Sequence, residues 1–172
     1  PTFGEDTMNR FAPIALAAAL LGTCATQTVL AQESATLKKV KDTGSITLGH
    51  RESSIPFSYY DDKQQVIGYS NELMHKAVEA IKADLKLAKL DTKMMPVTAA
   101  NRISLVQNGT VDIECGSTTN NLERQKQVGF STSIFVVTTR LMAKKDSGIK
   151  DFPDLAGKNV VTTAGTTSER LL

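Results

Sequence analysis

The sequence contains no tryptophan, few aromatic residues, and only two cysteines and two histidines among its 172 residues. The two histidines, His50 and His75, stand far apart, so no spacing typical of metal ligands is present and no cofactor is expected. The formal net charge is only +2 at pH 7, so a nucleic-acid partner has no electrostatic support. No block of like charges and no internal repeat appears. The chain is long enough for one domain with a packed core, or for one domain and part of another.

The N-terminal residues have the pattern of a secretory signal peptide. Met8-Asn9-Arg10 gives a short positive start, an apolar run follows over residues 11–22, and small or aliphatic residues precede Gln32. The pattern predicts a signal peptide over residues 8–31, cut after Ala31. The apolar run is too short to span a membrane. Residues 1–7 lie before the expected initiator methionine and are upstream or non-native residues.

Two other interpretations of this segment remain open. The apolar run is compatible with a buried helix, and Cys24 is compatible with a lipoprotein anchor, although Thr23 precedes it where a smaller residue is usual. After cleavage one cysteine, Cys115, remains in a chain sent to an oxidising compartment. A single cysteine there suggests a missing partner or a free thiol, and is a first indication that the chain is incomplete.

Apolar periodicity predicts alternating strands and helices over the rest of the chain. The expected strands lie at residues 45–49, 90–97, 111–114, 134–143 and 159–163, and the expected helices at residues 32–41, 70–85, 101–108, 122–128 and 151–155. This alternation predicts an α/β fold with a mostly parallel sheet.

Helix boundaries follow from capping residues. Ser70 is expected to cap the amphipathic helix whose apolar residues recur every four positions. Those positions are Leu73, Ala77, Ile81 and Leu85, with Met74 and Val78 beside them. Thr98 is expected to cap the helix at residues 101–108, which Gly109 ends.

Three loops are expected at the carboxyl ends of strands, where α/β proteins bind ligands. They are residues 50–60, 115–121 and 164–169. The middle loop is a hydroxyl-rich turn between a strand and a helix, and its backbone N–H groups and hydroxyls are suited to an anion. A plain N-cap and turn is the alternative interpretation.

Two arginines stand beside these loops. Arg51 follows the first expected strand, and Arg102 opens the short helix after the second. Arginine is suited to forked recognition of a carboxylate. Each arginine alone is more often a solvated surface residue, but two arginines with two hydroxyl-rich turns reverse that preference and predict a site for a small dianion.

Several motifs resemble one protein family from about Leu37 to the end of the chain. The motifs lie at residues 49–60, 101–102, 107–110, 114–121 with 123–126, and 165–169, and the most specific is Glu114-Cys115-Gly116-Ser117-Thr118-Thr119-Asn120-Asn121. On these motifs the chain resembles the periplasmic glutamate/aspartate-binding proteins of ABC transporters.

The resemblance implies a two-lobe periplasmic-binding-protein fold of type II, with the ligand between lobes joined by hinge strands. It implies lobe 1 at residues 32–134, a hinge strand at residues 135–142 and the start of lobe 2 at residues 143–172. The first lobe would be nearly complete and the second only begun, because relatives are much longer. The group that binds the ligand ammonium, a ligand-contacting histidine and a partner for Cys115 would lie in the absent part.

The resemblance also implies a role for five residues. Arg51 would pair with the ligand side-chain carboxylate and Arg102 with its α-carboxylate. Ser117 and Thr119 would add hydrogen bonds, and Thr167 would contact the ligand when the lobes close. Ala99 stands where the family often has serine, which bears on affinity or on the preference between aspartate and glutamate.

The function implied is capture of L-glutamate or L-aspartate in the periplasm by a monomer, followed by delivery to the membrane permease of an ABC transporter. No enzyme activity is expected. Two alternatives remain. A ligand-sensing module of a receptor would need a transmembrane segment downstream, and a periplasmic enzyme on the same fold would need a nucleophile–base pair, which these residues do not offer.

Overall fold

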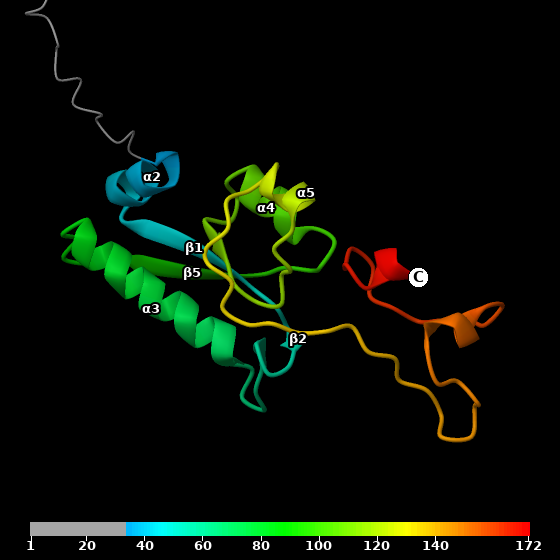
Figure 1. The fold of residues 1–172 in the computed structure, drawn as a ribbon. Coiled ribbons are helices and arrows are strands. Elements are labelled where there is room, and N and C mark those ends of the chain that lie inside the picture. The colour runs from blue at the N-terminus through cyan, green and yellow to red at the C-terminus, as the bar shows by residue number, and fades with distance from the viewer. Residues whose placement is uncertain (1–33) are drawn as a thin grey trace, which may run out of the picture. The chain divides into compact units, whose positions relative to one another are not determined.

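The computed structural model describes residues 34–172 (Figure 1). The expected signal peptide, residues 1–7 and Cys24 lie outside the described residues. Three parallel strands form the central sheet, in which β1 (Ser45–His50) lies between β5 (Asp91–Pro96) and β6 (Ile113–Glu114). Leu48 pairs with Met94 on one side and with Ile113 on the other. The predicted parallel α/β sheet is confirmed.

The core forms where two helices meet the central strand. Helix α2 (Ala35–Thr43) precedes β1, and α3 (Tyr69–Asp84) runs along the sheet (Figure 1). The buried core residues are Val40, Ile46, Leu48, Met74 and Val78. Burying each such side chain stabilises the fold by roughly 1.5–3 kcal/mol. Helix α2 ends at Gly44, whose φ of 62° suits glycine.

The buried face of α3 differs from the predicted one by one position. Met74 and Val78 are buried and Ile81 and Leu85 pack against them, whereas Ala77 is exposed. The predicted cap, Ser70, is wrong because α3 begins at Tyr69 and its N-cap is Gly68, two residues before Ser70. Gly68 has φ 117°, and a Cβ there would lie 2.5 Å from the carbonyl oxygen of Phe57. The tight chain path at Gly68 therefore sets the start of the helix.

A small antiparallel sheet begins within the segment predicted as a loop at residues 50–60 and extends beyond it. It consists of β2 (Ser53–Ser54), β3 (Ser58–Tyr60) and β4 (Val66–Ile67). His50 belongs to the buried end of β1, where its ring meets Tyr60 edge-on at 5.4 Å. The sheet therefore shapes the loop that carries Arg51.

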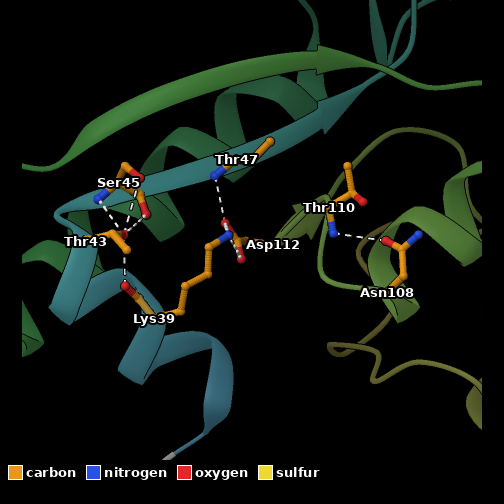
Figure 2. Close-up of polar contacts among 7 residues, drawn as sticks. All are labelled: Lys39, Thr43, Ser45, Thr47, Asn108, Thr110 and Asp112. Atoms are coloured by element: carbon orange, nitrogen blue, oxygen red, sulfur yellow. Dashed lines mark hydrogen bonds and ion pairs between the residues drawn. The ribbon is translucent and has the colours of Figure 1, made fainter.

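Asp112 joins α2 to the central sheet (Figure 2). Its side chain is 2% exposed and accepts hydrogen bonds from Lys39 Nζ at 2.8 and 2.9 Å. The backbone N–H of Thr47 donates to the same carboxylate at 2.9 Å, while the N–H of Asp112 donates to the carbonyl of Thr47. Asp112 therefore fixes the position of β6 beside β1.

The remaining helices are short: one lies between β5 and β6, and the others follow β6. They are α4 (Arg102–Gln107), α5 (Leu122–Gln125), and two 3-10 turns, η1 (Phe152–Leu155) and η2 (Glu169–Leu171). The strands predicted at residues 134–143 and 159–163 are wrong, because the structure forms no strand in either range. The assignment of residues 135–142 as a hinge stays a prediction. A strand needs a neighbour to satisfy its backbone groups, and no described residue pairs with these segments.

The start of the segment predicted as a hinge nevertheless contacts the first part of the chain. The Phe135 ring meets Phe57 edge-on at 5.0 Å and Tyr69 at 6.1 Å. The Tyr69 hydroxyl donates to the carbonyl of Ile134 at 3.1 Å. The division into lobe 1, hinge and lobe 2 remains a prediction.

Candidate ligand-binding site

The carboxyl ends of the three strands lie at one edge of the sheet, because β1 pairs in parallel with both β5 and β6. Arg51 follows β1, Ala99 follows β5, and Glu114 ends β6. The segments after β5 and β6 then lead into α4 and α5, so most candidate residues gather at this edge.

Arg102 is a buried arginine with an unsatisfied head group. It is the first residue of α4 and 2% exposed, and neither Nε nor Nη1 has a hydrogen-bond partner among the described residues. Burial, together with the nearby charges of Arg124 and Arg51, lowers its pKa to about 10 against the opposing effect of Glu114. Leaving a buried guanidinium unpaired is costly, so this arrangement favours an anion at Arg102.

The turn before α4 positions Arg102. Asn101 accepts a hydrogen bond from the N–H of Thr98 at 2.8 Å, and the Thr98 hydroxyl accepts one from the N–H of Asn101 at 3.2 Å. The prediction that Thr98 caps this helix is wrong, because the N-cap is Asn101 and no side chain caps the helix. Gly109, with φ 76°, follows the end of the helix as predicted.

Arg51 is held through its backbone. Its N–H donates to the Ser58 hydroxyl at 2.9 Å, and that hydroxyl donates to the Arg51 carbonyl at 3.1 Å. Its side-chain stem crosses Gly116, where an added Cβ would lie 2.7 Å from Arg51 Cγ. A side chain at position 116 would therefore displace Arg51.

The hydroxyl-rich turn at residues 115–121 is tied down on several sides. The Ser70 hydroxyl donates to the Gly116 carbonyl at 2.8 Å, and Ser117 donates to the Ser54 hydroxyl at 3.3 Å. Asn121 caps α5 by accepting from the N–H of Arg124 at 2.9 Å. The turn thus contains an N-cap, and the anion site stays a prediction. Helix α5 is too short to contribute much dipole, so an anion would rely on arginines and hydroxyls.

Arg124 connects this turn to the segment at residues 164–169. Its Nη1 donates to the Thr119 carbonyl at 2.9 Å and its Nη2 to the Gly165 carbonyl at 3.1 Å. The hydroxyls of Thr119 and Thr167 lie 3.3 Å apart. Burial lowers the pKa of Arg124, and Arg170 lowers it further. Unlike Arg102, Arg124 therefore uses its head group within the chain.

The predicted site residues fall into two neighbouring cavities. Arg102, Ser117, Thr119 and Thr167 line a cavity of about 840 Å³. Arg51 instead lines a second cavity of about 430 Å³ together with Ala99 and Ala164. Four of the five residues thus line one cavity, and Arg51 lines the other while its stem packs against Gly116 of the first.

Two charged residues at the site were not singled out from the sequence. Glu114 and Arg124 are both largely shielded from solvent and lie within the charge field of Arg102. A signal did exist, because Glu114 is the last residue of a strand-like run directly before the hydroxyl turn. Arg124 gave no signal of burial, because it stands in a polar run.

The described residues contain neither a metal-ligand group nor a membrane-spanning helix. No group of three or more His, Cys, Asp or Glu side chains could hold a metal ion there. In the same part of the chain, no helix is both long and apolar enough to cross a membrane.

Comparison with known proteins identifies close relatives. An L-glutamate/L-aspartate-binding protein of Pseudomonas aeruginosa is 60% identical over 165 residues, covering 95% of this chain and 55% of that protein. A glutamate/aspartate import solute-binding protein of Salmonella typhimurium is 61% identical over 137 residues, covering 80% of this chain and 45% of that protein. The chain therefore spans about half the length of these curated relatives.

A solved structure supports the fold. A mutant of the arginine-bound domain 1 of TmArgBP matches with a TM-score of 0.50 and 20% identity, covering 58% of this chain and 71% of that one. The chain therefore has the α/β periplasmic-binding-protein fold, and the structural match covers about one lobe.

A sequence model of one family matches residues 46–167, which is most of the chain. That family consists of solute-binding proteins, so its members bind solutes rather than convert them, as expected above. On this match the chain belongs to the bacterial extracellular solute-binding proteins, family 3.

Proposed function

We propose that this chain binds L-glutamate or L-aspartate as the solute-binding component of an ABC importer. The observation that carries the proposal is Arg102, a buried guanidinium whose Nε and Nη1 have no partner among the described residues. A carboxylate is the ligand that such a group accepts best, through charge-assisted, forked hydrogen bonds. The names of the two bacterial relatives support an acidic amino acid as the ligand.

The proposed contacts follow the chemistry of a dicarboxylic amino acid. Arg102 receives the α-carboxylate and Arg51, whose stem packs against Gly116 of the hydroxyl-rich turn, receives the side-chain carboxylate. Ser117 and Thr119 add hydroxyl donors from the turn after β6. Thr167 adds a contact from the segment that Arg124 holds beside that turn. No covalent bond is made or broken.

The proposed cycle uses closure of two lobes around the ligand. Residues 32–134 form the first lobe, residues 135–142 the hinge and residues 143–172 the beginning of the second lobe. The contacts of Arg124 and Thr167 across these segments are the kind that closure makes. The closed, ligand-bound form then docks on the membrane permease of the transporter.

The proposed location is the periplasm. The family is described as extracellular, which agrees with export from the cytoplasm. The finer proposal is that residues 8–31 are a signal peptide cut after Ala31, and that the released protein works as a monomer in the periplasm.

Calorimetric titration tests the function directly. Residues 32–172 are titrated with L-glutamate, L-aspartate and L-glutamine, and binding of the two acids without glutamine is expected. The same titrations on a chain extended to the length of the curated relatives provide the decisive control. Absence of binding of both acids by the extended chain would overturn the proposal.

A further inference from the structure

Glu114 is a buried carboxylate that the proposed ligand contacts do not use. It ends β6, opposite Gly49 in the parallel register, and its Oε2 accepts a hydrogen bond from the Thr118 hydroxyl at 2.6 Å. Its other oxygen, Oε1, is buried and has no partner among the described residues. A carboxylate in such surroundings needs a compensating charge to remain ionised.

Three arginines supply that compensating charge. Arg102, Arg51 and Arg124 each lower the pKa of Glu114, although burial outweighs them and leaves it raised overall. Conversely, Glu114 raises the pKa of Arg102 and so favours its charged form. No ion pair within 4.0 Å joins Glu114 to any of the three in the part of the chain that the structure describes. Glu114 therefore acts on them through space and leaves Nε and Nη1 of Arg102 without a partner among the described residues.

Two glycines make room for this carboxylate. A Cβ at Gly49 would lie 3.3 Å from Glu114 Cγ, and a Cβ at Gly116 would lie 3.1 Å from Glu114 Oε1 and 2.7 Å from Arg51 Cγ. Glu114 and Arg51 thus both pack against Gly116. The carboxylate has a defined place between β1 and the hydroxyl turn, and that place is close to the arginines.

We propose that Glu114 is a specificity-determining residue: its carboxylate competes with the carboxylates of the ligand for the arginines, and so limits how much negative charge the site accepts. This inference rests on the proposed function for the identity of the ligand. In the empty protein, Glu114 offsets the mutual repulsion of the three guanidinium groups. When an anion arrives, the same carboxylate repels it and weakens its binding.

The sign of one mutational effect separates this role from a structural one. Glu114→Gln keeps the shape and removes the charge, so it should bind L-glutamate roughly tenfold more tightly, with a larger preference over L-glutamine. The gain should shrink as salt is added, because part of it is electrostatic. A purely structural role would instead weaken binding of both amino acids.

Matched variants complete the design. Glu79→Gln makes the same change of net charge at an exposed position of α3 and should leave both affinities unchanged. Glu114→Asp keeps the charge but shortens the side chain, and should keep the native preference for glutamate over glutamine. All variants are made in the full chain and measured by calorimetry at low and high salt. Unchanged or weaker glutamate binding by folded Glu114→Gln would overturn the proposal.

A sulfate measurement keeps this inference separate from the proposed function. If the native chain binds neither acidic amino acid, the proposed function fails, but sulfate still probes the arginines as a simple dianion. Sulfate should then raise the melting temperature of Glu114→Gln more than that of the native chain or of Glu79→Gln. Equal increases in all three would overturn the role of Glu114.

A measurement on the native chain covers failure of Glu114→Gln to fold. The three arginines lower the pKa of Glu114, and bound sulfate would offset part of their charge. The pKa of Glu114 should then rise, so sulfate binding should be accompanied by proton uptake at mildly acidic pH. The nearby titratable groups are His50 and Cys115, so the uptake is measured in buffers of different ionisation enthalpy across that range. Sulfate binding without proton uptake would overturn the proposal.

Discussion

The same kinds of apolar residue are buried in residues 34–128 and exposed in residues 129–172. Val40 and Leu48 in the first region are fully buried, whereas Val136, Met142 and Val161 in the second are 85–100% exposed. The first region has a three-stranded parallel sheet with a packed core, and the second has only two 3-10 turns. An apolar β-rich run therefore becomes a strand only where another segment supplies hydrogen bonds and a packing surface.

The same contrast holds for the charged residues. Asp112 in the first region is 2% exposed and accepts three hydrogen bonds. Arg170 in the second region pairs with Glu123 across the two regions, and both of these side chains are about half exposed or more. The first region should thus be sensitive to single substitutions, and the second should tolerate them.

The largest expected effect is the loss of ligand affinity in Arg102→Ala. Removing the guanidinium partner of a buried ligand carboxylate should cost about 3–5 kcal/mol of binding free energy, which weakens Kd by roughly two to four decades. Thr167→Val, the matched change in the second region, removes one hydroxyl and should lower affinity by less than about tenfold. Calorimetry with L-glutamate on the chain extended to the relatives' length measures both. Normal glutamate binding by Arg102→Ala would contradict the assigned site.

A substitution in the core is expected to affect stability nearly as strongly. Leu48→Ala removes a fully buried side chain from the central strand and should lower the free energy of unfolding by about 2–5 kcal/mol. Val136→Ala removes an exposed side chain of the second region and should change the free energy of unfolding by about 0.5 kcal/mol or less. Urea denaturation monitored by circular dichroism compares them. Similar losses for the two variants would mean that the second region is packed in solution.

The buried carboxylate of Asp112 should contribute an intermediate amount. Asp112→Ala leaves the N–H of Thr47 without its side-chain acceptor and Lys39 without its partner, so a loss of about 1.5–3 kcal/mol is expected. Lys39→Ala should lower stability less, because the Lys39 side chain is 41% exposed. The same urea denaturation measures both. Equal losses of unfolding free energy would show that Asp112 stabilises the fold through its ion pair with Lys39 rather than through its hydrogen bond to Thr47.

The sequence predicted most of the first region because its signals are local. The parallel strands, the helix on the sheet, the Gly109 helix end and the two arginines all follow from periodicity, glycine and arginine chemistry. The start of α3 was missed because the path at Gly68 is set by the carbonyls of Pro56 and Phe57, which lie outside the helix. Glu114 was missed as a site residue because its burial beside three arginines is a property of the folded chain. The strands predicted in the second region depend on neighbours that the described residues do not provide.

The smallest expected effect concerns the ion pair between Glu123 and Arg170, which joins the two regions. An exposed pair usually contributes no more than about 1 kcal/mol, and salt screens it. A double-mutant cycle of Glu123→Ala and Arg170→Ala, measured by urea denaturation, should give a coupling energy of about 0.2–1 kcal/mol that falls in 1 M salt. Lys38→Ala and Asp42→Ala, an exposed pair within α2, provide the control cycle. A coupling much larger than that of the control would mean that Arg170 is held against the first region more firmly than its exposure suggests, and that the two regions unfold as one unit.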